Sequence, residues 1–360
     1  MQRIGVLLVL GACSSSGSGG MLPSSSSDSG RLSAGMHHTC VVQNDGSVWC
    51  WGRNQYGELG VATMDSSAVP VKAAFGDAIA VAGGMQSTCG IKSDGTVWCW
   101  GRMISDTFNY MPTQVTGVSN VTQLALSEGA ICGLAADHTA WCWTSPTSAT
   151  QVASDVTKVT PSCALHSDGT VTCWGDNSYG QLGTASGSGS GPVTVAGLSD
   201  AVDLASGYDH NCAVRSDGSV WCWGENTAGE LGVAPSSTVC PFGNNMWPCR
   251  PSAAAVPGLT AQSIVAGEGF ELALQADGTI AGVGEDGTGE LGGPADPACD
   301  DPFGEACSYK PVAVQTVQHA VLVTAQLSHG CAIQSDNAVY CWGEEFPPGV
   351  TKVASFTYAP

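Results

Sequence analysis

Cysteine pairs at a constant spacing place the strongest constraint on how this chain folds. Six pairs are ten positions apart, and each pair brackets a similar segment with an Asp midway between the cysteines. A seventh copy of the segment spans 272–284 and has Leu272 and Gly282 where the cysteines would stand. Seven copies of one unit indicate a repeat architecture. The six pairs are Cys40 with Cys50, Cys89 with Cys99, Cys132 with Cys142, Cys163 with Cys173, Cys212 with Cys222, and Cys331 with Cys341.

Each copy has the pattern of a β-hairpin, with alternating apolar residues on both sides of a turn that is Asp-Gly in most copies. A three-residue turn centred on the Asp, with Gly in a left-handed conformation, puts the two cysteines directly opposite each other. His138 and Asn337 replace this Gly in two copies, and both residue types tolerate a positive φ. Opposed Cα atoms at a non-hydrogen-bonded site lie about 4.5 Å apart, which suits a disulfide. We therefore expect six disulfides, each within one hairpin.

Tetrahedral zinc held by paired cysteines is the alternative to these disulfides. Zinc sites of this kind use short Cys-x-x-Cys spacings, and the chain has none. Both cysteines are also lost together in the seventh copy, as expected if the two bond to each other. The spacing therefore favours disulfides.

The hairpins carry apolar residues on both faces, because Val41 and Trp49 point one way while Val42 and Val48 point the other. Such a sheet must be covered on both sides, as the blades of a propeller are. Segments before the hairpins (78–84, 121–127, 201–207) and Pro-Val segments after them (69–75, 191–198, 310–317) supply two further strands. We predict an all-β, seven-bladed β-propeller over residues 31–360, with four-stranded antiparallel blades and disulfide-stapled hairpins. The tail 350–353 is expected to close the ring against the first blade.

The N-terminal segment has the features of an export signal. Arg3 precedes a short apolar run, and Leu10-Gly11-Ala12-Cys13 resembles the lipobox of bacterial lipoproteins, in which the Cys is lipidated. We expect a lipoprotein-type signal peptide at 1–12 and a Ser/Gly-rich tether at 13–30. An ordinary signal peptide cut near Ala12 is the alternative. Both place the chain outside the cytoplasm, as an outer-membrane or cell-surface lipoprotein or a secreted protein, where disulfides persist.

Glycine-rich segments follow several hairpins: NQYGELG at 54–60, NSYGQLG at 177–183, NTAGELG within 225–232 and DGTGELG at 286–292. With these segments, residues 31–360 resemble the regulator of chromosome condensation family. The resemblance implies a seven-bladed propeller. The family's eukaryotic founder is a nucleotide exchange factor for a small nuclear GTPase on chromatin, and one type of secreted bacterial relative inhibits β-lactamases. The resemblance supports the fold and leaves the activity open.

A formal net charge of −20 limits the possible partners. It disfavours nucleic acid, whose binding needs a basic surface, and it disfavours docking on anionic lipid. We therefore expect contact with a membrane only through a lipid anchor. The charge would attract a cationic partner or a divalent cation.

No catalytic signature is present, since the chain lacks GxSxG, HExxH and GxxxxGK motifs. His38, His210 and His329 each stand two residues before the first Cys of a hairpin. A metal site between His38 and His329 is possible if the ring brings the first and last blades together, but we favour packing at strand ends. The Trp residues within the strands, such as Trp49, are interpreted as blade packing. We expect no catalytic residue, metal or cofactor.

Two cysteine-flanked inserts interrupt the repeats, at 240–249 and 299–307. Both follow a GELG segment, so they should emerge on one face from neighbouring blades. Four cysteines allow three pairings, of which we expect Cys240–Cys249 and Cys299–Cys307. Aromatic and Met side chains are typical interface anchors, and the candidate binding residues are Phe242, Asn244, Asn245, Met246, Trp247, Asp300, Asp301, Phe303 and Glu305. The alternatives are that the inserts only cap the blades, or that a Ca²⁺ ion binds at Asp296, Asp300, Asp301 and Glu305.

These features predict a monomeric, extracytoplasmic, non-catalytic scaffold that binds a protein partner through loops on a rigid frame. Three alternatives remain: an inhibitor of a secreted enzyme such as a β-lactamase, a guanine nucleotide exchange factor-like activity, and a channel-centred polysaccharide-active enzyme. A close pair of buried carboxylates near the propeller axis would favour the enzyme.

Overall fold

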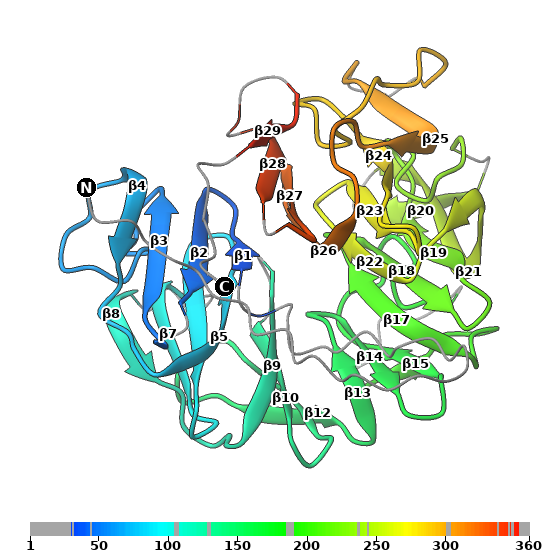
Figure 1. Ribbon diagram of the computed structural model, residues 1–360. Helices are drawn as coiled ribbons and strands as arrows, with labels where there is room; N and C mark the ends of the chain where they lie inside the picture. Colours follow the sequence, from blue (N-terminus) through cyan, green and yellow to red (C-terminus); the bar gives the residue numbers. More distant parts are fainter. Residues whose placement is uncertain are drawn as a thin grey trace, which may run out of the picture.

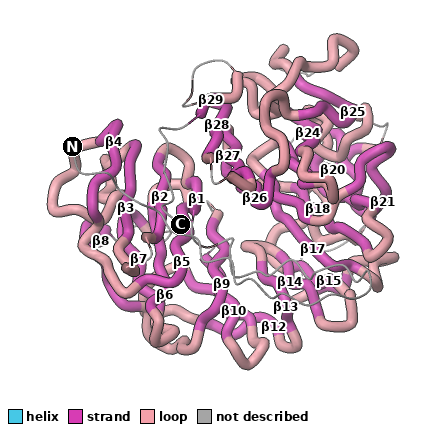
Figure 2. The backbone as a smooth tube through the Cα atoms, viewed as in Figure 1, coloured by secondary structure: helices cyan, strands magenta, loops and turns pink. Residues whose placement is uncertain are grey.

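Seven antiparallel sheets form a ring around a central channel, as the computed structural model shows (Figure 1). The structure describes residues 30, 32–43, 45–103, 108–127, 131–184, 191–235, 238–242, 245–299, 304–336, 338–344, 346 and 349–352. Within these ranges the chain forms strands and loops only (Figure 2), and no helix there is long and apolar enough to span a bilayer. The predicted seven-bladed propeller is confirmed.

The blades follow one another along the chain, and each is built from consecutive strands. The first blade contains β1 (Leu32–Ala34), β2 (His38–Val42), β3 (Val48–Gly52) and β4 (Ser67–Lys72). The second contains β5 (Ala78–Gly83), β6 (Ser87–Lys92), β7 (Val97–Arg102) and β8 (Phe108–Gln114). The third contains β9 (Val121–Leu126), β10 (Ile131–Ala135), β11 (Ala140–Trp143) and β12 (Thr150–Ala153). The fourth contains β13 (Val156–Val159), β14 (Cys163–His166), β15 (Val171–Cys173) and β16 (Val193–Thr194).

The last three blades carry the variations on this plan. The fifth contains β17 (Ala201–Ser206), β18 (His210–Arg215), β19 (Ser219–Glu225), β21 (Asn245–Thr260) and a fifth strand, β20 (Val239–Phe242). The sixth contains β22 (Ser263–Ala266), β23 (Phe270–Leu274), β24 (Ile280–Glu285) and β25 (Cys307–Ala313). The seventh contains β26 (Ala320–Gln326), β27 (His329–Gln334), β28 (Val339–Gly343) and β29 (Thr351–Lys352). The first strand of each blade lies next to the channel (Figure 1).

Among the described residues, the central hairpins have the predicted three-residue turn. In the first blade, the Gln43 amide donates to the Ser47 carbonyl (2.8 Å) and the Gly46 amide donates to the Gln43 carbonyl (2.9 Å). Gly46 has a φ of +74°, and His138 takes its place in the third blade with a φ of +65°. Asn337, the other predicted replacement, lies outside the described residues. Asp45 Oδ1 accepts from the Ser47 amide at 2.9 Å and braces the turn.

All six predicted hairpin disulfides are present, with Cα–Cα distances of 4.0–4.1 Å. In each of these six blades the two cysteines face each other in the register of the hairpin, as the three-residue turn requires. The bonds join Cys40 to Cys50, Cys89 to Cys99, Cys132 to Cys142, Cys163 to Cys173, Cys212 to Cys222, and Cys331 to Cys341.

The sixth blade keeps the same register without a disulfide. Leu272 pairs with Gly282 at the positions that cysteines occupy elsewhere. A Cβ on Gly282 would lie 3.0 Å from the Leu272 side chain, so this leucine fills the space that a disulfide takes in the other blades. The joint loss of two cysteines is thus compensated by one large apolar residue.

The predicted role of the tail was wrong. Strand β29 pairs with β28 as the outer strand of the seventh blade and does not extend the first blade. The chain after β28 supplies the outer strand that this blade would otherwise lack. Neither the first nor the seventh blade therefore combines strands from both ends of the described chain. The ring closes through side-chain packing, with Leu32 and Val41 of the first blade in one apolar cluster with Ile333 and Val339 of the seventh.

Three of the tryptophans that follow a second cysteine link neighbouring blades. Trp100, Trp223 and Trp342 are fully buried. Each indole nitrogen donates to a main-chain carbonyl in the glycine-rich segment of the preceding blade, at Glu58 (2.8 Å), Gln181 (2.9 Å) and Glu290 (2.7 Å). Within such a segment, Asn54 Oδ1 accepts from the Leu59 amide at 2.9 Å and holds the turn in shape. The glycine-rich segments of the first, fourth and sixth blades are therefore inter-blade anchors.

Replacing Cys89 and Cys99 together by Ala should lower the free energy of unfolding by about 2–3 kcal/mol, because the bond closes a loop of about eleven residues in the unfolded chain. Urea unfolding followed by tryptophan fluorescence measures the change. The Leu272–Gly282 hairpin shows that the blade geometry itself needs no disulfide. A double variant that loses all propeller structure would contradict this.

Candidate functional site

The propeller presents two different faces. On one, the turns of the central hairpins meet the links between blades, as where the Ala78 amide donates to the Gly46 carbonyl at 2.9 Å; we call it the Asp-Gly face. On the other, the loop after the first strand meets the loop after the third strand. The Glu225 amide donates there to the Asp209 carbonyl at 3.0 Å. Both inserts follow a third strand, so we call this the insert face.

The first insert extends the sheet of the fifth blade. Strands β20 and β21 form a hairpin closed by the disulfide Cys240–Cys249, and Trp247 pairs in register with Cys240. The Pro248 carbonyl accepts from the Asn226 amide at 3.0 Å, which ties the hairpin to the GELG segment. Met246 is 57% exposed, whereas Trp247 is half-buried. The sequence indicated a loop here and missed the fifth strand.

Other candidate residues of the first insert are only partly described. The main chains of Phe242 and Asn245 pair with each other at the end of the hairpin. Their side chains and the whole of Asn244 lie outside the described residues. Val239 is 40% exposed, so this hairpin presents at least two exposed apolar side chains, Val239 and Met246.

The second insert is closed by Cys299–Cys307, as predicted. The Asp286 amide donates to the Ala306 carbonyl at 2.7 Å, and Glu305 is exposed. Asp296 accepts from the Ala298 amide (3.0 Å) and lies 3.5 Å from Lys310 Nζ. Asp300, Asp301 and Phe303 lie outside the described residues, so the Ca²⁺ hypothesis stays untested.

The two inserts share a base on the fifth blade. The Tyr309 ring packs directly over Gly229 of the GELG segment, where an added Cβ would lie 2.4 Å from the ring. The Cys299 sulfur lies 4.0 Å from the Ala228 carbonyl of the same segment. The inserts therefore stand next to each other on one face (Figure 1).

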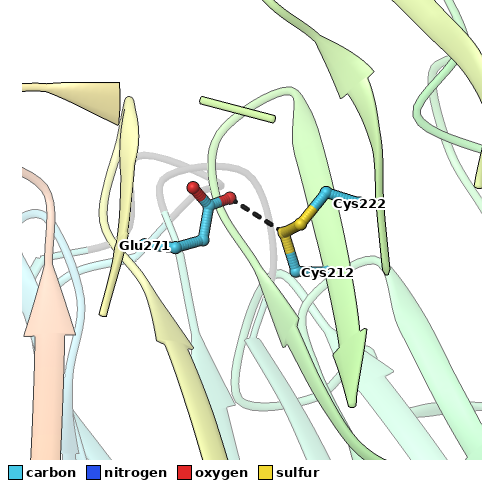
Figure 3. Close-up of side chains that lie close together, drawn as sticks. All are labelled: Cys212, Cys222 and Glu271. Atoms are coloured by element: carbon cyan, nitrogen blue, oxygen red, sulfur yellow. Dashed lines mark hydrogen bonds between the residues drawn. A yellow bond between two sulfur atoms is a disulfide. The ribbon is translucent and has the colours of Figure 1, made fainter. Parts of the chain in front are cut away.

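A buried ion pair lies beneath this base and was missed by the sequence analysis. His210 Nε2 lies 2.6 Å from Glu271 Oε1, and both side chains are fully buried. Glu271 also approaches the Cys212–Cys222 disulfide, with the Cys212 sulfur 3.1 Å away (Figure 3). The signal was present: Glu271 is the one charged residue in the apolar strand Phe270–Leu274.

The pair connects the two blades that carry the inserts. The sixth blade has Val283 where the second, fifth and seventh blades have Trp100, Trp223 and Trp342, so it does not form their indole bond to the preceding blade. His210 and Glu271 take over the connection. The equivalent contact between the first two blades is neutral, with His38 Nε2 2.8 Å from Thr88 Oγ1.

Burial and charge shift the pKa of several groups in this region. Burial alone would lower the pKa of His210, but the Glu271 carboxylate outweighs it and raises the pKa to about 9. Burial, followed by repulsion from Glu225, raises the pKa of Asp209 to about 6 and that of Glu230 to about 8. Acidic groups are thus crowded on the insert face of the fifth blade.

His38 and His329 pack at strand ends, which is the arrangement that we favoured over a metal site between them. The His38 ring lies over Gly35, where an added Cβ would meet it at 2.3 Å. Burial lowers the pKa of His38 to about 3 and that of His329 to about 4. Among the described residues, the only group of three possible metal ligands is Cys212, Cys222 and Glu271, whose two sulfurs form a disulfide.

The central channel is a cavity of about 510 Å³ lined by the first strands of the blades. It narrows toward the insert face, where Gln326 Nε2 donates across the channel to the Leu126 carbonyl at 3.4 Å. Lys158 is the only charged residue among the described lining residues, and its ammonium contacts Asp203. The described lining does not contain the carboxylate pair that would favour a polysaccharide-active enzyme.

Replacing Glu271 by Ala should lower the free energy of unfolding by about 3 kcal/mol or more, because His210 is left buried without a partner. Glu271→Thr should cost less, since a hydroxyl serves the same histidine position at His38 and Thr88. The pair's stabilisation should be complete below pH 6.5 and fall as the pH rises through about 9. Chemical unfolding of both variants between pH 6 and 10 measures this. Two results would count against the ion pair. One is an equal loss of unfolding free energy in Glu271→Ala and Glu271→Thr. The other is a difference in unfolding free energy between wild type and variant that does not depend on pH.

Comparisons with known proteins agree with this fold. The family described as Regulator of chromosome condensation (RCC1) repeat matches residues 31–58, 162–181 and 201–230, and a second description of the same repeat matches 45–91. No curated protein matches the sequence.

Several solved structures are similar to the chain. Yeast RCC1 (Prp20), solved bound to Kap60, has a TM-score of 0.55 and 22% identity over 90% of this chain and 74% of its own. Prp20p from Saccharomyces cerevisiae, whose structure was described with its binding properties to Gsp1p and histones, has a TM-score of 0.55 and 21% identity over 90% and 76%. The ectodomain of the receptor kinase CR4 from Physcomitrella patens has a TM-score of 0.55 and 17% identity over 88% and 74%. The matched repeats and the propeller fold together support the regulator of chromosome condensation repeat family for this chain.

Proposed function

We propose that the chain is an extracytoplasmic, non-catalytic scaffold that binds a protein partner through the insert face of the fifth and sixth blades. One observation carries the proposal: two disulfide-closed inserts stand side by side on that face, on a shared base. Loops held on a rigid frame are the usual recognition elements of such folds.

The two inserts should lose little conformational entropy when they bind a partner. Each is closed by its own disulfide, and the first is also paired as a sheet strand. Segments that are already ordered lose less conformational entropy on binding. Met246 (57% exposed) and Tyr208 (53% exposed) supply apolar contact area on the face of the fifth blade. Aromatic and Met side chains are enriched at protein interfaces.

The charge of this face favours a partner with a basic surface. Asp209 and Glu225 repel each other, and Glu268 and Glu305 are exposed nearby on the same face. A basic side chain placed here would relieve that repulsion and steer association. The similar structures support protein binding in general terms, since yeast Prp20 was solved bound to Kap60 and was described with its binding properties to Gsp1p and histones.

Eight disulfides indicate an oxidising environment. We extend the proposal to a lipid anchor at Cys13, on the basis of its lipobox-like segment. Intact-mass measurement of the protein isolated from its source should find a chain that begins at Cys13 and carries acyl groups. A mature chain without lipid would reject the anchor and leave the proposed binding face untouched.

Replacing Met246 and Tyr208 by Ala should weaken binding of the partner by about thirtyfold, the equivalent of about 2 kcal/mol for lost interface anchors. The partner is first captured from envelope and culture fractions with the wild-type chain, then titrated by calorimetry. Thermal unfolding should change little, because both side chains are exposed.

Val202→Ala is the matched control, because Val202 is 52% exposed at the opposite end of the fifth blade's first strand. It should bind as the wild type does. The reverse result, with loss in Val202→Ala and undiminished binding by the double variant, would move the site to the Asp-Gly face.

A further inference from the structure

The mouth of the channel on the Asp-Gly face is rimmed by β-branched side chains. In five blades, the first strand skips one residue close to this face when it pairs with the second strand. Such a bulge re-aims the side chain of the extra residue. Three of these residues are aliphatic, and Ile79, Val202 and Val321 are 43%, 52% and 52% exposed. Thr122 and Thr157 hold the same position in the third and fourth blades. One repeat position therefore exposes apolar surface around this opening.

The rim leads into the central cavity. Ile79 and Thr122 line that cavity as well as the mouth, and its volume is about 510 Å³. Pockets that hold small ligands have volumes of about 300–1,000 Å³, so the cavity is large enough for a short segment of a ligand. The hydrogen bond from Gln326 to the Leu126 carbonyl narrows the other end of the channel. A ligand would therefore enter from the Asp-Gly face, opposite the inserts.

The inner edges of the first strands turn main-chain groups toward the cavity. The Val81 amide donates to the Gly30 carbonyl at 2.6 Å, so one edge already holds a piece of main chain that runs along the channel. The Ile264 amide has the same place in the sixth blade and donates to Asp203 Oδ2 at 2.9 Å. Edge amides in the channel thus bind both a main-chain carbonyl and a carboxylate.

Two further edges have the same geometry. Leu124 and Leu204 match Val81 in register, because each of the three pairs with the residue that follows the first cysteine of its blade. Their amides therefore point at the channel as the Val81 amide does, and both residues line the cavity. An extended peptide can add to such an edge as a further strand, with its own carbonyls accepting from the edge amides.

Charge differs between the face and the cavity behind it. The turn of each hairpin carries an exposed Asp, and the seven are Asp45, Asp94, Asp137, Asp168, Asp217, Asp277 and Asp336. In the first six, a hydrogen bond from the Ser or Thr two residues later lowers the pKa of the carboxyl group, so it is ionised at neutral pH. Inside the cavity, the ammonium of Lys158 contacts Asp203, so these two charges balance. The face thus attracts basic groups, whereas the cavity suits an uncharged segment.

We propose that the mouth of the channel on the Asp-Gly face is a second binding site, which takes the extended, apolar end of a peptide with a basic flank. The apolar side chains of the peptide contact the rim at Ile79 and Val321 and enter the cavity. Its main chain pairs with the strand edges at Leu124 and Leu204, and its basic flank meets the exposed aspartates. The site lies on the face opposite the inserts, so it is independent of the proposed function.

The probe is a capped peptide of four apolar residues followed by three lysines, labelled at the lysine end and titrated onto the full chain by fluorescence anisotropy. Ile79→Ser with Val321→Ser should weaken its binding by about tenfold, because apolar contact area is lost. The fold should be unaffected, since both side chains are exposed. Val69→Ser with Val239→Ser is the matched control: these valines are 65% and 40% exposed on β4 and β20, away from the rim. It should bind the peptide as the wild type does.

A second probe tests the main-chain pairing on the wild-type chain, so it does not depend on how a variant folds. Methylation of alternate amide nitrogens in the apolar part of the peptide should weaken binding by about tenfold, because strand addition needs those N–H groups. Equal affinity for the two probes would overturn the site, and so would unchanged affinity in the rim variant or equal weakening in the control. Sedimentation gives a further check: a wild-type dimer that the rim variant dissociates would assign the rim to a second copy of the chain and reject the peptide. Failure on any of these points leaves the proposed function at the inserts standing.

Discussion

In the part of the chain that the structure describes, a three-residue turn fixes the register of the two central strands of a blade, and the positions of the other functional groups follow from that register. A left-handed residue such as Gly46 or His138 closes the turn, which sets the two cysteine positions opposite each other. The same register decides which residues leave the third strand and on which face they emerge. For this reason the inserts and the crowded acids occupy one face.

Contacts between blades then decide how rigidly that face is held. Buried tryptophans such as Trp342 bond to the glycine-rich segment of the preceding blade. The junction between the fifth and sixth blades lacks this bond and uses His210 and Glu271 instead. Asp203 adds a second link along the channel, since it accepts from the Ile264 amide at 2.9 Å and contacts Lys158. The blades that carry the inserts are thus held in part by charged groups.

Features that depend on nearby residues could be predicted from the sequence, whereas those set by distant contacts could not. The hairpins and all eight disulfides follow from spacings of ten residues or fewer. The Glu271 contact joins residues 61 positions apart in the chain, and only the ring brings them together. The tail resembles 156–159, an inner strand, yet 351–352 form an outer strand, because strand propensity does not specify which edge is joined. Of the predicted insert residues, the structure places Met246, Trp247 and Glu305 on the insert face.

The central claim is that a protein partner binds the insert face, and hydrogen–deuterium exchange of the chain with and without its captured partner tests it most directly. The account predicts slower exchange in 207–209, 226–231 and 238–249 when the partner is bound. The hairpin turns of the Asp-Gly face should exchange at unchanged rates. Protection confined to those turns, such as 45–47 and 216–219, with none in the inserts, would contradict the account.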